Sequence, residues 1–333
     1  MSRAPEDTVA LVTGATDGLG RAVAERLAGM GMTVHIHGRN TEKLATAKEE
    51  IVAATGNEKI HTHRADFASL AEVGALADEI AALPSLHLLI NNAGIGSGLP
   101  DSPDREESRD GLELRFAVNY LASFVLTTRL VPLLERSAPA RVVMVASLGQ
   151  ASLDFDDPQL ERSLYEGRRA YAQSKLAQIS FANELAYRLP TDSGVTVNSL
   201  HPATFMPTKI VLDERGTSVD ALDRGVDSTV HLATDPSLEG VERHDLIGAL
   251  DEVPNYHVRY FHVEPGKQTR REQHPHDHGV VIQNGRARVT LGDEVHEVGP
   301  GDVVYVAGDE LHCFEAIGDE PLGFICVIPP LAR

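Results

Sequence analysis

The first two thirds of the chain alternate short apolar runs with longer segments in which apolar residues recur every three or four positions. Runs such as Leu86–Ile90 and Val142–Val145 are apolar nearly throughout, which is typical of parallel strands covered by helices on both faces. The longer segments have the period of one helix face. The pattern predicts strands at 8–13, 33–37, 60–64, 86–91, 140–146 and 195–200, and helices up to residue 30 and at 41–54, 69–82, 109–135 and 166–189. This βα alternation predicts an α/β domain on a doubly wound parallel sheet.

From about Arg243 the rhythm changes to short strand-like runs separated by Gly, Pro, Asn and Asp. The predicted strands are 257–263, 280–283, 286–291, 294–298, 303–306, 311–316 and 322–328. Asn284-Gly285, between two alternating runs, predicts a β-hairpin. Regular short strands without a helical period indicate a small all-β barrel or jelly roll. We therefore expect two domains, at 1–240 and 244–333.

Composition narrows the class of partners. Thirty Lys and Arg against 49 Asp and Glu give a net charge of −19, which argues against nucleic acid and anionic membranes. No apolar run approaches the ~20 residues of a membrane span, and Met1 to Thr8 lacks the apolar core of a signal peptide. With two cysteines there is no disulfide framework. A soluble cytoplasmic protein is expected, with a small-molecule substrate and no nucleic-acid or membrane partner.

A glycine-rich turn follows the first predicted strand, in Gly14-Ala-Thr-Asp-Gly18-Leu-Gly20. Glycines allow close approach of a pyrophosphate, and a helix N-terminus supplies N–H groups and a positive dipole end. An ordinary strand-turn-helix would fit these residues equally well. The second strand ends in Arg39 without the acidic residue of an NAD site, so Arg39, with Arg21, would suit a 2′-phosphate unless both are merely solvated.

Tyr171 and Lys175 lie four positions apart on a predicted helix, so both side chains emerge on one face. A lysine ammonium one turn away favours the phenolate and would lower the pKa of the tyrosine toward neutrality. Such a pair also occurs by chance on helix surfaces. Histidines 35, 37, 61 and 63 alternate along strands, and we expect them to be packing residues.

The motifs TGATDGLG, NNAG, Asn119, Ser147, YAQSK and His201-Pro202 occur together in the order of the short-chain dehydrogenase/reductase family, which residues 5–240 resemble. The resemblance implies a Rossmann-type fold and catalysis by Asn119, Ser147, Tyr171 and Lys175. In it Tyr171 passes a proton, Ser147 binds the carbonyl oxygen, Lys175 holds the nicotinamide ribose and Asn119 anchors a water relay. The 24-residue spacing from Ser147 to Tyr171 resembles the retinol-dehydrogenase branch.

The resemblance implies a nicotinamide dinucleotide cofactor, and Arg39 with the missing acidic residue favours NADP(H) over NAD(H). Asp66 would bind the adenine amino group, and residues 204–228 would form a substrate lid. The implied cofactor-binding residues are Gly14, Thr16, Asp17, Gly18, Leu19, Gly20, Arg39, Asp66, Phe67, Asn92, Ala93, Gly94, Tyr171, Lys175, Pro202 and Thr204. Asp235–Gly240 replaces the lead into the family's seventh strand, so the sheet would be truncated or completed from elsewhere.

The last 90 residues contain an acidic and histidine-rich run, Glu272-Gln-His274-Pro-His276-Asp-His278, and a later His312. Along a strand, residues 272 to 278 at every second position share one face, which suits a bound cation or a solvated loop. Together with VEPG and PGDVVYV, the run resembles small metal-binding cupins. This resemblance implies Glu272, His274, His278 and His312 as ligands, with His276 as a substitute. Mixed nitrogen and oxygen ligation suits Fe, Mn, Ni, Cu or Zn.

These features lead to three functional hypotheses. The first is a bifunctional oxidoreductase that interconverts a carbonyl and an alcohol on a small, apolar molecule, with a metal-binding cupin that catalyses a second step. In the second, the cupin is a non-catalytic dimerisation or ligand-sensing module. The third is a redox sensor that binds NADP without turnover. The presence of all four implied catalytic residues argues against this third hypothesis. A homo-oligomer, dimer or larger, is expected from the family.

Overall fold

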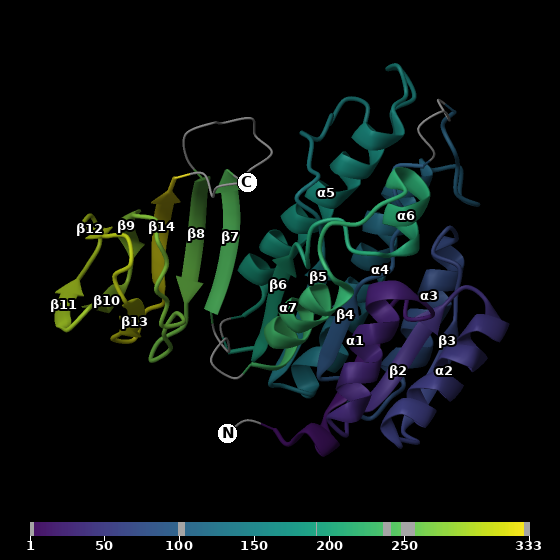
Figure 1. The fold of residues 1–333 in the computed structure, drawn as a ribbon, viewed down its shortest axis with the longest axis horizontal. Coiled ribbons are helices and arrows are strands. Elements are labelled where there is room, and N and C mark those ends of the chain that lie inside the picture. The colour runs from purple at the N-terminus through teal and green to yellow at the C-terminus, as the bar shows by residue number, and fades with distance from the viewer. Residues whose placement is uncertain (1–2, 99–103, 191, 236–240, 248–256, 330–333) are drawn as a thin grey trace. The chain divides into compact units, whose positions relative to one another are not determined.

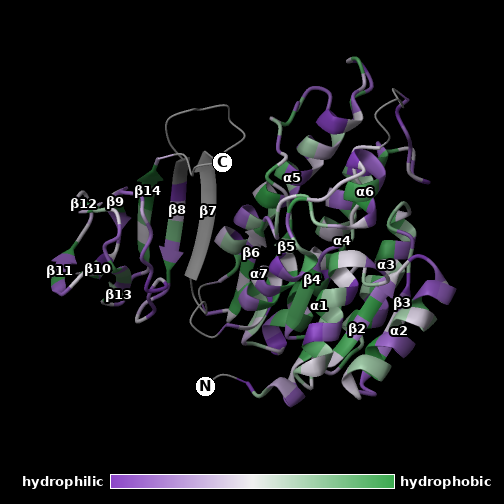
Figure 2. Cartoon of the chain, in the orientation of Figure 1, coloured by the Kyte–Doolittle hydropathy of each residue, from purple (hydrophilic) through white to green (hydrophobic). Residues whose placement is uncertain are grey.

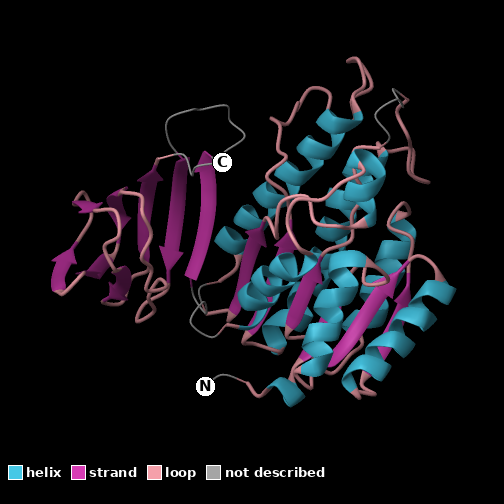
Figure 3. Cartoon of the chain, in the orientation of Figure 1, coloured by secondary structure: helices cyan, strands magenta, loops and turns pink. Residues whose placement is uncertain are grey.

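The computed structural model describes residues 3–98, 104–190, 192–235, 241–247 and 257–329. The chain forms two units, Met1–Thr234 and Asp235–Arg333. All the described helices lie in the first unit, and the described part of the second contains strands and turns (Figures 1 and 3). The predicted domain boundary at residue 240 falls outside the described residues.

The first unit is a parallel sheet with helices on both faces. Its strands follow the order β3-β2-β1-β4-β5-β6, so the chain reverses direction across the sheet between β1 and β4. The strands are β1 (Val9–Val12), β2 (Thr33–Gly38), β3 (Ile60–Arg64), β4 (Leu88–Asn91), β5 (Ala140–Val145) and β6 (Val195–Leu200). The helices are η1 (Pro5–Asp7), α1 (Gly18–Gly29), α2 (Thr41–Thr55), α3 (Leu70–Ala81), η2 (Phe116–Leu121), α4 (Ala122–Arg136), α5 (Gly167–Arg188), α6 (Lys209–Arg215) and α7 (Leu222–Thr234).

Successive residues of each strand point to opposite faces of the sheet and pack in two separate hydrophobic cores. In β1, Ala10 and Val12 pack on the face covered by α1, α2 and α7, while Leu11 packs on the face covered by α3, α4 and α5. Burial on both faces explains why the central strands are apolar throughout (Figure 2). The Rossmann-type architecture predicted from the sequence is confirmed.

One helix differs from the prediction at its start. Residues 104–113 form turns closed by a bridge between Glu107 and Glu113, and the helix begins at Leu114, directly before the π-helical turn η2, rather than at residue 109. By length and composition alone, the helix Phe116–Arg136 is apolar enough to cross a membrane, which differs from the expectation that no apolar stretch is that long. Of its most apolar window, 56% is buried inside the structure, and α4 packs in the core of the sheet. This is the pattern of a buried core helix.

The second unit is antiparallel throughout its described part. One sheet has the order β12-β9-β14-β8-β7 and the other the order β11-β10-β13. The strands are β7 (Val241–Ile247), β8 (His257–Val263), β9 (His278–Asn284), β10 (Arg286–Leu291), β11 (Glu294–Val298), β12 (Val303–Val306), β13 (His312–Ile317) and β14 (Leu322–Ile328). Side chains of both sheets share one core, which includes Ile282, Val289, Phe314 and Phe324. The jelly-roll prediction is confirmed.

Two connections depart from the sequence prediction. The strand β7, which was not predicted, pairs with β8 and therefore belongs to the antiparallel sheet rather than to the parallel one. The hairpin predicted at Asn284-Gly285 is wrong, because β9 and β10 lie in different sheets. Gly285 has a φ of +70°, and a Cβ there would lie 2.3 Å from the Pro321 carbonyl oxygen. The glycine thus allows the chain to cross between sheets against a neighbouring turn. The two-residue hairpin is Gly292-Asp293, between β10 and β11.

Candidate functional site

The glycine-rich turn is packed directly against the end of β4. A Cβ at Gly14 would lie 2.7 Å from the Ala93 Cα, and one at Gly20 would lie 2.3 Å from the Gly14 carbonyl oxygen. Only glycine fits these close approaches. The Asn92 amide donates to the carbonyls of Thr13 and Gly14 at 2.9 and 3.2 Å, and the Ala93 N–H donates to the Thr13 hydroxyl. The motifs predicted at Gly14–Gly20 and Asn92–Gly94 therefore form one structure at the carboxyl edge of the sheet.

A buried histidine lies beneath this turn. His37 on β2 accepts the Gly14 N–H at Nδ1, 3.3 Å away, and its Nε2 lies 3.1 Å from the Ala65 carbonyl oxygen, which fixes the neutral tautomer with the proton on Nε2. Its ring stacks on Phe67, with centroids 4.2 Å apart. Burial lowers the pKa of His37 to about 4. His37, expected from the sequence to be a packing residue, thus also supports the glycine-rich turn.

The start of α1 faces a cavity of ≈ 430 Å³ that Thr16, Asp17, Arg21 and Lys43 help to line. Arg39, at the end of β2, is exposed, and no carboxylate of the described residues pairs with its guanidinium. Arg21, in contrast, is paired with Glu50. The lining of this cavity thus combines two cationic side chains, Arg21 and Lys43, with three acidic ones that include Asp17 and Glu50, where the adenosine end of a dinucleotide would lie on this fold.

Asp66, the predicted partner of an adenine, already has partners of its own. Its carboxylate pairs with Arg109 at 3.1 Å and accepts the Ala68 N–H at 3.1 Å. Phe67 is buried beside it. The structure thus places both residues at the end of β3 near the glycine turn, with Asp66 engaged in an ion pair that the sequence did not predict.

The four predicted catalytic residues come together from three elements. Ser147 follows β5, Tyr171 and Lys175 lie on α5, and Asn119 lies in the π-helical turn η2. The hydroxyls of Ser147 and Tyr171 are hydrogen-bonded. The Lys175 ammonium donates to the Val145 carbonyl at 2.9 Å, which fastens α5 to the end of β5. These side chains therefore form one cluster at the carboxyl ends of the central strands.

Asn119 ties this cluster to the cofactor motif. Its amide oxygen accepts the Ile95 N–H at 2.8 Å, and its amide nitrogen donates to the Ile95 carbonyl at 3.1 Å and to the Ser174 hydroxyl at 2.9 Å. A Cβ at Gly94 would lie 3.2 Å from the Asn119 amide oxygen and 3.7 Å from Lys175 Nζ. Asn119 therefore holds the loop after β4 against α5.

The pKa of Tyr171 does not follow the sequence prediction. Burial raises the pKa of the phenol, the hydrogen bond from Ser147 opposes the rise, and the Glu214 carboxylate adds to it. Lys175 does not lower it: its ammonium lies 6.0 Å from the tyrosine ring centroid and is bonded to Val145 and Gln178. Burial also lowers the pKa of Lys175 to about 8. Desolvation thus outweighs the attraction that the one-turn spacing suggested.

The segment predicted as a lid, 204–228, contains the short helix α6 and the start of α7. Thr208 lies against the glycine turn, where its Cγ2 would be 3.4 Å from a Cβ at Gly18. Pro202 is buried, and the Thr204 N–H donates to Asp220 at 2.7 Å. The predicted cofactor contacts Pro202 and Thr204 therefore lie in a segment that reaches the glycine-rich turn.

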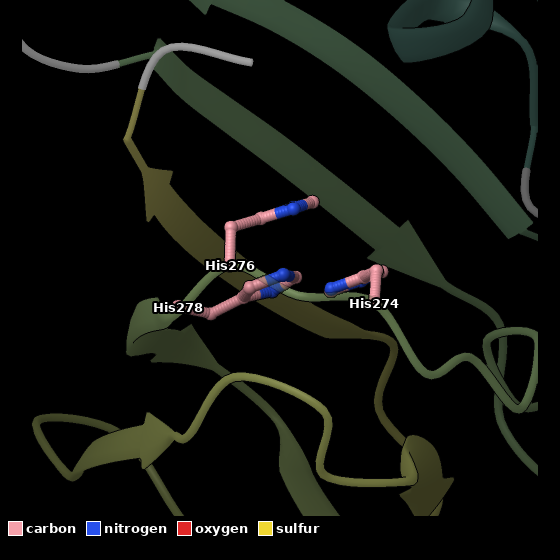
Figure 4. A group of neighbouring side chains, drawn as sticks. All are labelled: His274, His276 and His278. Atoms are coloured by element: carbon pink, nitrogen blue, oxygen red, sulfur yellow. The ribbon is translucent and has the colours of Figure 1, made fainter. Parts of the chain in front are cut away.

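The histidine cluster of the second unit converges, although from a turn rather than from a continuous strand. Residues 275 and 276 form a bend, and only His278 lies in a strand. The rings of His274 and His276 stack with centroids 4.0 Å apart, and those of His274 and His278 lie 4.4 Å apart (Figure 4). Glu272 and His312 exchange two backbone hydrogen bonds, of 3.0 and 2.9 Å, which bring His312 to the same place.

The cluster has the features of a cation site. His274 Nδ1, His276 Nε2 and His278 Nε2 are buried without a hydrogen-bond partner. The three rings can each offer one nitrogen such that these nitrogens lie within 4.8 Å of one another. A second such set contains Glu272, His274 and His312. Burial and the neighbouring imidazoles lower the pKa of His278 to about 3, so its ring is neutral and able to ligate. The buried unpartnered atoms include His276, which the sequence analysis gave only as a substitute, whereas Glu272 is exposed.

A buried thiol supports one of these rings. Cys326 Sγ lies 3.3 Å from His278 Nδ1. A hydrogen bond at the remote ring nitrogen is the usual support of a metal-binding histidine. Neither Cys326 nor Glu214, on α6, was singled out from the sequence, because neither lies in a recognisable motif.

Comparison with known proteins agrees with this geometry. The sequence model of the short chain dehydrogenase family matches residues 8–217, and that of the cupin domain matches residues 259–328. The chain is 42% identical to retinol dehydrogenase 11 of Mus musculus over 199 residues, which cover 59% of this chain and 61% of that protein. It is 36% identical to polyprenol dehydrogenase of Homo sapiens over 273 residues, which cover 76% of this chain and 80% of that protein.

A solved metagenomic short-chain oxidoreductase in complex with NADP matches with a TM-score of 0.53 at 26% identity, covering 68% of this chain and 90% of that one. The chain spans about three fifths of the length of the retinol dehydrogenases that it matches. The first family model covers most of the first unit, and the second covers most of the strands of the second unit. The chain therefore belongs to the short-chain dehydrogenase family and carries a cupin domain at its C-terminal end.

Proposed function

We propose that the protein is an NADP(H)-dependent oxidoreductase that interconverts a carbonyl and an alcohol on a small, apolar organic substrate. The observation that carries this proposal is the hydrogen bond between Ser147, which follows β5, and Tyr171, which lies on α5, the helix that Lys175 fastens to the end of β5. The names of two relatives, a retinol and a polyprenol dehydrogenase, support apolar alcohols and aldehydes as the substrate class.

Each residue of the cluster has its own role in the proposed reaction. The nicotinamide cofactor, when bound, supplies or accepts the hydride. Ser147 donates a hydrogen bond to the substrate oxygen and holds it beside Tyr171. Because burial raises the pKa of Tyr171, the phenol keeps its proton at neutral pH and donates it to the oxygen of a carbonyl undergoing reduction. Lys175 and Asn119 keep α5, β5 and the loop after β4 in register, so these donors are preorganised for the developing negative charge. A water relay through Asn119 remains part of the proposal.

The preference for NADP(H) over NAD(H) rests on charge. The end of β2 offers the exposed guanidinium of Arg39 and no carboxylate to a ribose. A planar guanidinium binds a phosphate through two parallel hydrogen bonds. We therefore expect Arg39 to contact the 2′-phosphate.

We further propose that the cupin binds a divalent transition metal, Fe, Mn, Ni, Cu or Zn. The three buried, unpartnered imidazole nitrogens support this, because burying such groups is costly unless they bind something. The proposed ligands are His274, His278 and His312, with Glu272 or His276 as the fourth. The metal would supply Lewis acidity for a second step on a related molecule, while the alternative is a cupin that serves only for dimerisation or ligand sensing. A cytoplasmic homo-oligomer without membrane or nucleic-acid partners completes the proposal.

The decisive experiment follows NADPH and NADH oxidation at 340 nm with a panel of aldehydes and ketones that includes retinal. We expect activity with NADPH, and a loss of about 10²- to 10⁴-fold in kcat in Tyr171→Phe. Tyr187→Phe is the matched control, because Tyr187 lies on the same helix and is 87% exposed. Undiminished turnover in Tyr171→Phe would refute the assignment.

The cupin is tested separately on the full chain. Metal analysis of the purified protein should show one bound transition metal, which is lost in His274→Ala and His278→Ala but retained in His296→Ala, an exposed histidine on β11. Oxygen consumption without NADPH would favour a catalytic cupin of the oxygenase class. Metal-free wild-type protein that still forms oligomers would favour the non-catalytic module.

A further inference from the structure

A carboxylate on the lid helix is held close to the catalytic tyrosine. Glu214 of α6 accepts two hydrogen bonds of 2.9 Å, one from the Ser97 hydroxyl and one from the Gly98 N–H. Ser97 and Gly98 follow β4 in the loop that Asn119 anchors at Ile95. The two bonds fix the position of the carboxylate and join α6 to the loop after the cofactor motif.

The same loop packs over the start of the catalytic helix. A Cβ at Gly167, the first residue of α5, would lie 2.0 Å from the Ser97 carbonyl oxygen. Tyr171 lies four residues later, one helical turn along. Glu214, Ser97 and Tyr171 are therefore neighbours, and the Glu214 carboxylate contributes to raising the pKa of Tyr171.

The surrounding charges do not neutralise this carboxylate. Arg115 donates to the Gly96 carbonyl of this loop and is buried between the carboxylates of Glu106 and Glu113. Arg115 thus has two anionic partners before Glu214 is counted. On α6 itself, the Arg215 guanidinium stacks 3.8 Å from the Phe205 ring centroid. The Lys175 ammonium, 6.0 Å from the Tyr171 ring centroid, donates to Val145 and Gln178, so among the described residues the Glu214 carboxylate forms no ion pair.

We propose that Glu214 is a specificity-determining residue that excludes substrates with a carboxylate near the reacting carbonyl, so that the reductase site takes neutral aldehydes and ketones. The inference rests on the proposed function and narrows its substrate class. Two like charges near one another in a partly desolvated site repel strongly enough to change binding by tenfold or more. A neutral ester of the same shape meets no such repulsion.

The test uses a matched pair of aldehydes, 4-formylbenzoate and its methyl ester, with NADPH and the full chain. For the wild type we expect kcat/KM for the ester to exceed that for the acid by at least about tenfold. In Glu214→Gln the ratio should fall toward one, chiefly through a lower KM for the acid. Asp213→Asn is the control: Asp213 is the exposed neighbour on the same helix, and its variant should keep the wild-type ratio.

Two further measurements separate charge from structure. Ser97→Ala removes one hydrogen bond but keeps the carboxylate, so it should retain the discrimination. Raising NaCl from 0.05 to 0.5 M should shrink the wild-type ratio, a readout that needs no variant to fold. An equal kcat/KM for both aldehydes in the wild type, or an unchanged ratio in folded Glu214→Gln, overturns the role of Glu214. Failure to reduce any member of the carbonyl panel overturns the proposed function instead.

Discussion

The histidine beneath the glycine-rich turn couples the stability of the first unit to pH. His37 accepts the Gly14 N–H at Nδ1, so protonating that nitrogen removes the bond that supports the turn. Its pKa is lowered from 6.5 to about 4, first by burial and then by His63, while the Ala65 carbonyl and Asp66 act in the opposite direction. The folded state therefore binds fewer protons than the unfolded one. Its contribution to stability is complete above pH 6.5 and is lost as the pH falls toward 4.

The size of the effect follows from the two pKa values. A difference of about 2.5 units corresponds to roughly 3 kcal/mol when fully expressed, and to about 2 kcal/mol between pH 7 and pH 5. Burial likewise lowers the pKa of His35 to about 3 and that of His87 to about 4, so the wild type should lose more than this in total. Only the His37 share should vanish in His37→Gln, because a glutamine amide can accept from Gly14 and donate to Ala65 without titrating.

The assay is urea unfolding followed by circular dichroism at 222 nm, which reports the first unit because all the described helices lie there. Between pH 7 and 5 the free energy of unfolding should fall by about 2 kcal/mol less in His37→Gln than in the wild type. His37→Leu should instead cost about 1–3 kcal/mol at every pH, since it leaves the Gly14 N–H and the Ala65 carbonyl unpaired. Parallel pH profiles for the wild type and His37→Gln would refute the reasoning.

Two further predictions concern the ligands of each unit. Cys326→Ala should weaken metal binding by about 10- to 100-fold in a chelator competition, because His278 loses the partner of its remote nitrogen. Cys313→Ala should not weaken metal binding, because the Cys313 thiol donates to the Thr269 carbonyl at 3.2 Å and not to a histidine. Equal losses of affinity in the two variants would contradict a specific role of Cys326. Arg39→Ser should raise the KM for NADPH about tenfold and leave that for NADH unchanged, because the guanidinium binds only the 2′-phosphate. Arg21→Ser should cost less, given its pairing with Glu50; a larger loss there would show that the phosphate is held elsewhere.

Most strands and long helices could be predicted, because buried positions recur with a regular apolar period, but β7 and α7 were not predicted. Strands such as β3, β6 and β10 have the bounds that the alternation indicated. The helix α6 was not predicted, because it is one short segment that buries none of its residues and so shows no periodic apolar pattern. The hairpin at Asn284-Gly285 failed because the local turn signal does not reveal that the two flanking strands pair with different partners.

The candidate site likewise contains features that could be predicted from the sequence and features that could not. The family resemblance named Asn119, Ser147, Tyr171 and Lys175, and the structure places them near one another because they follow adjacent strands, β4 and β5, of one sheet. Their electrostatics could not be derived from spacing, because the pKa of Tyr171 depends on burial and on Glu214, which is 43 residues further along the chain. Long-range contacts of this kind have no local sequence signal.

The π-helical turn at Phe116–Leu121 makes the position of Asn119 depend on residue count. A π turn contains one residue more than the α turn that could replace it, so a single deletion here would restore regular α geometry. The residues before the deletion would then be rotated by about 100° relative to α4. The Asn119 amide would then turn away from its hydrogen-bond partners Ile95 and Ser174, although every side chain of the cluster would still be present in the sequence.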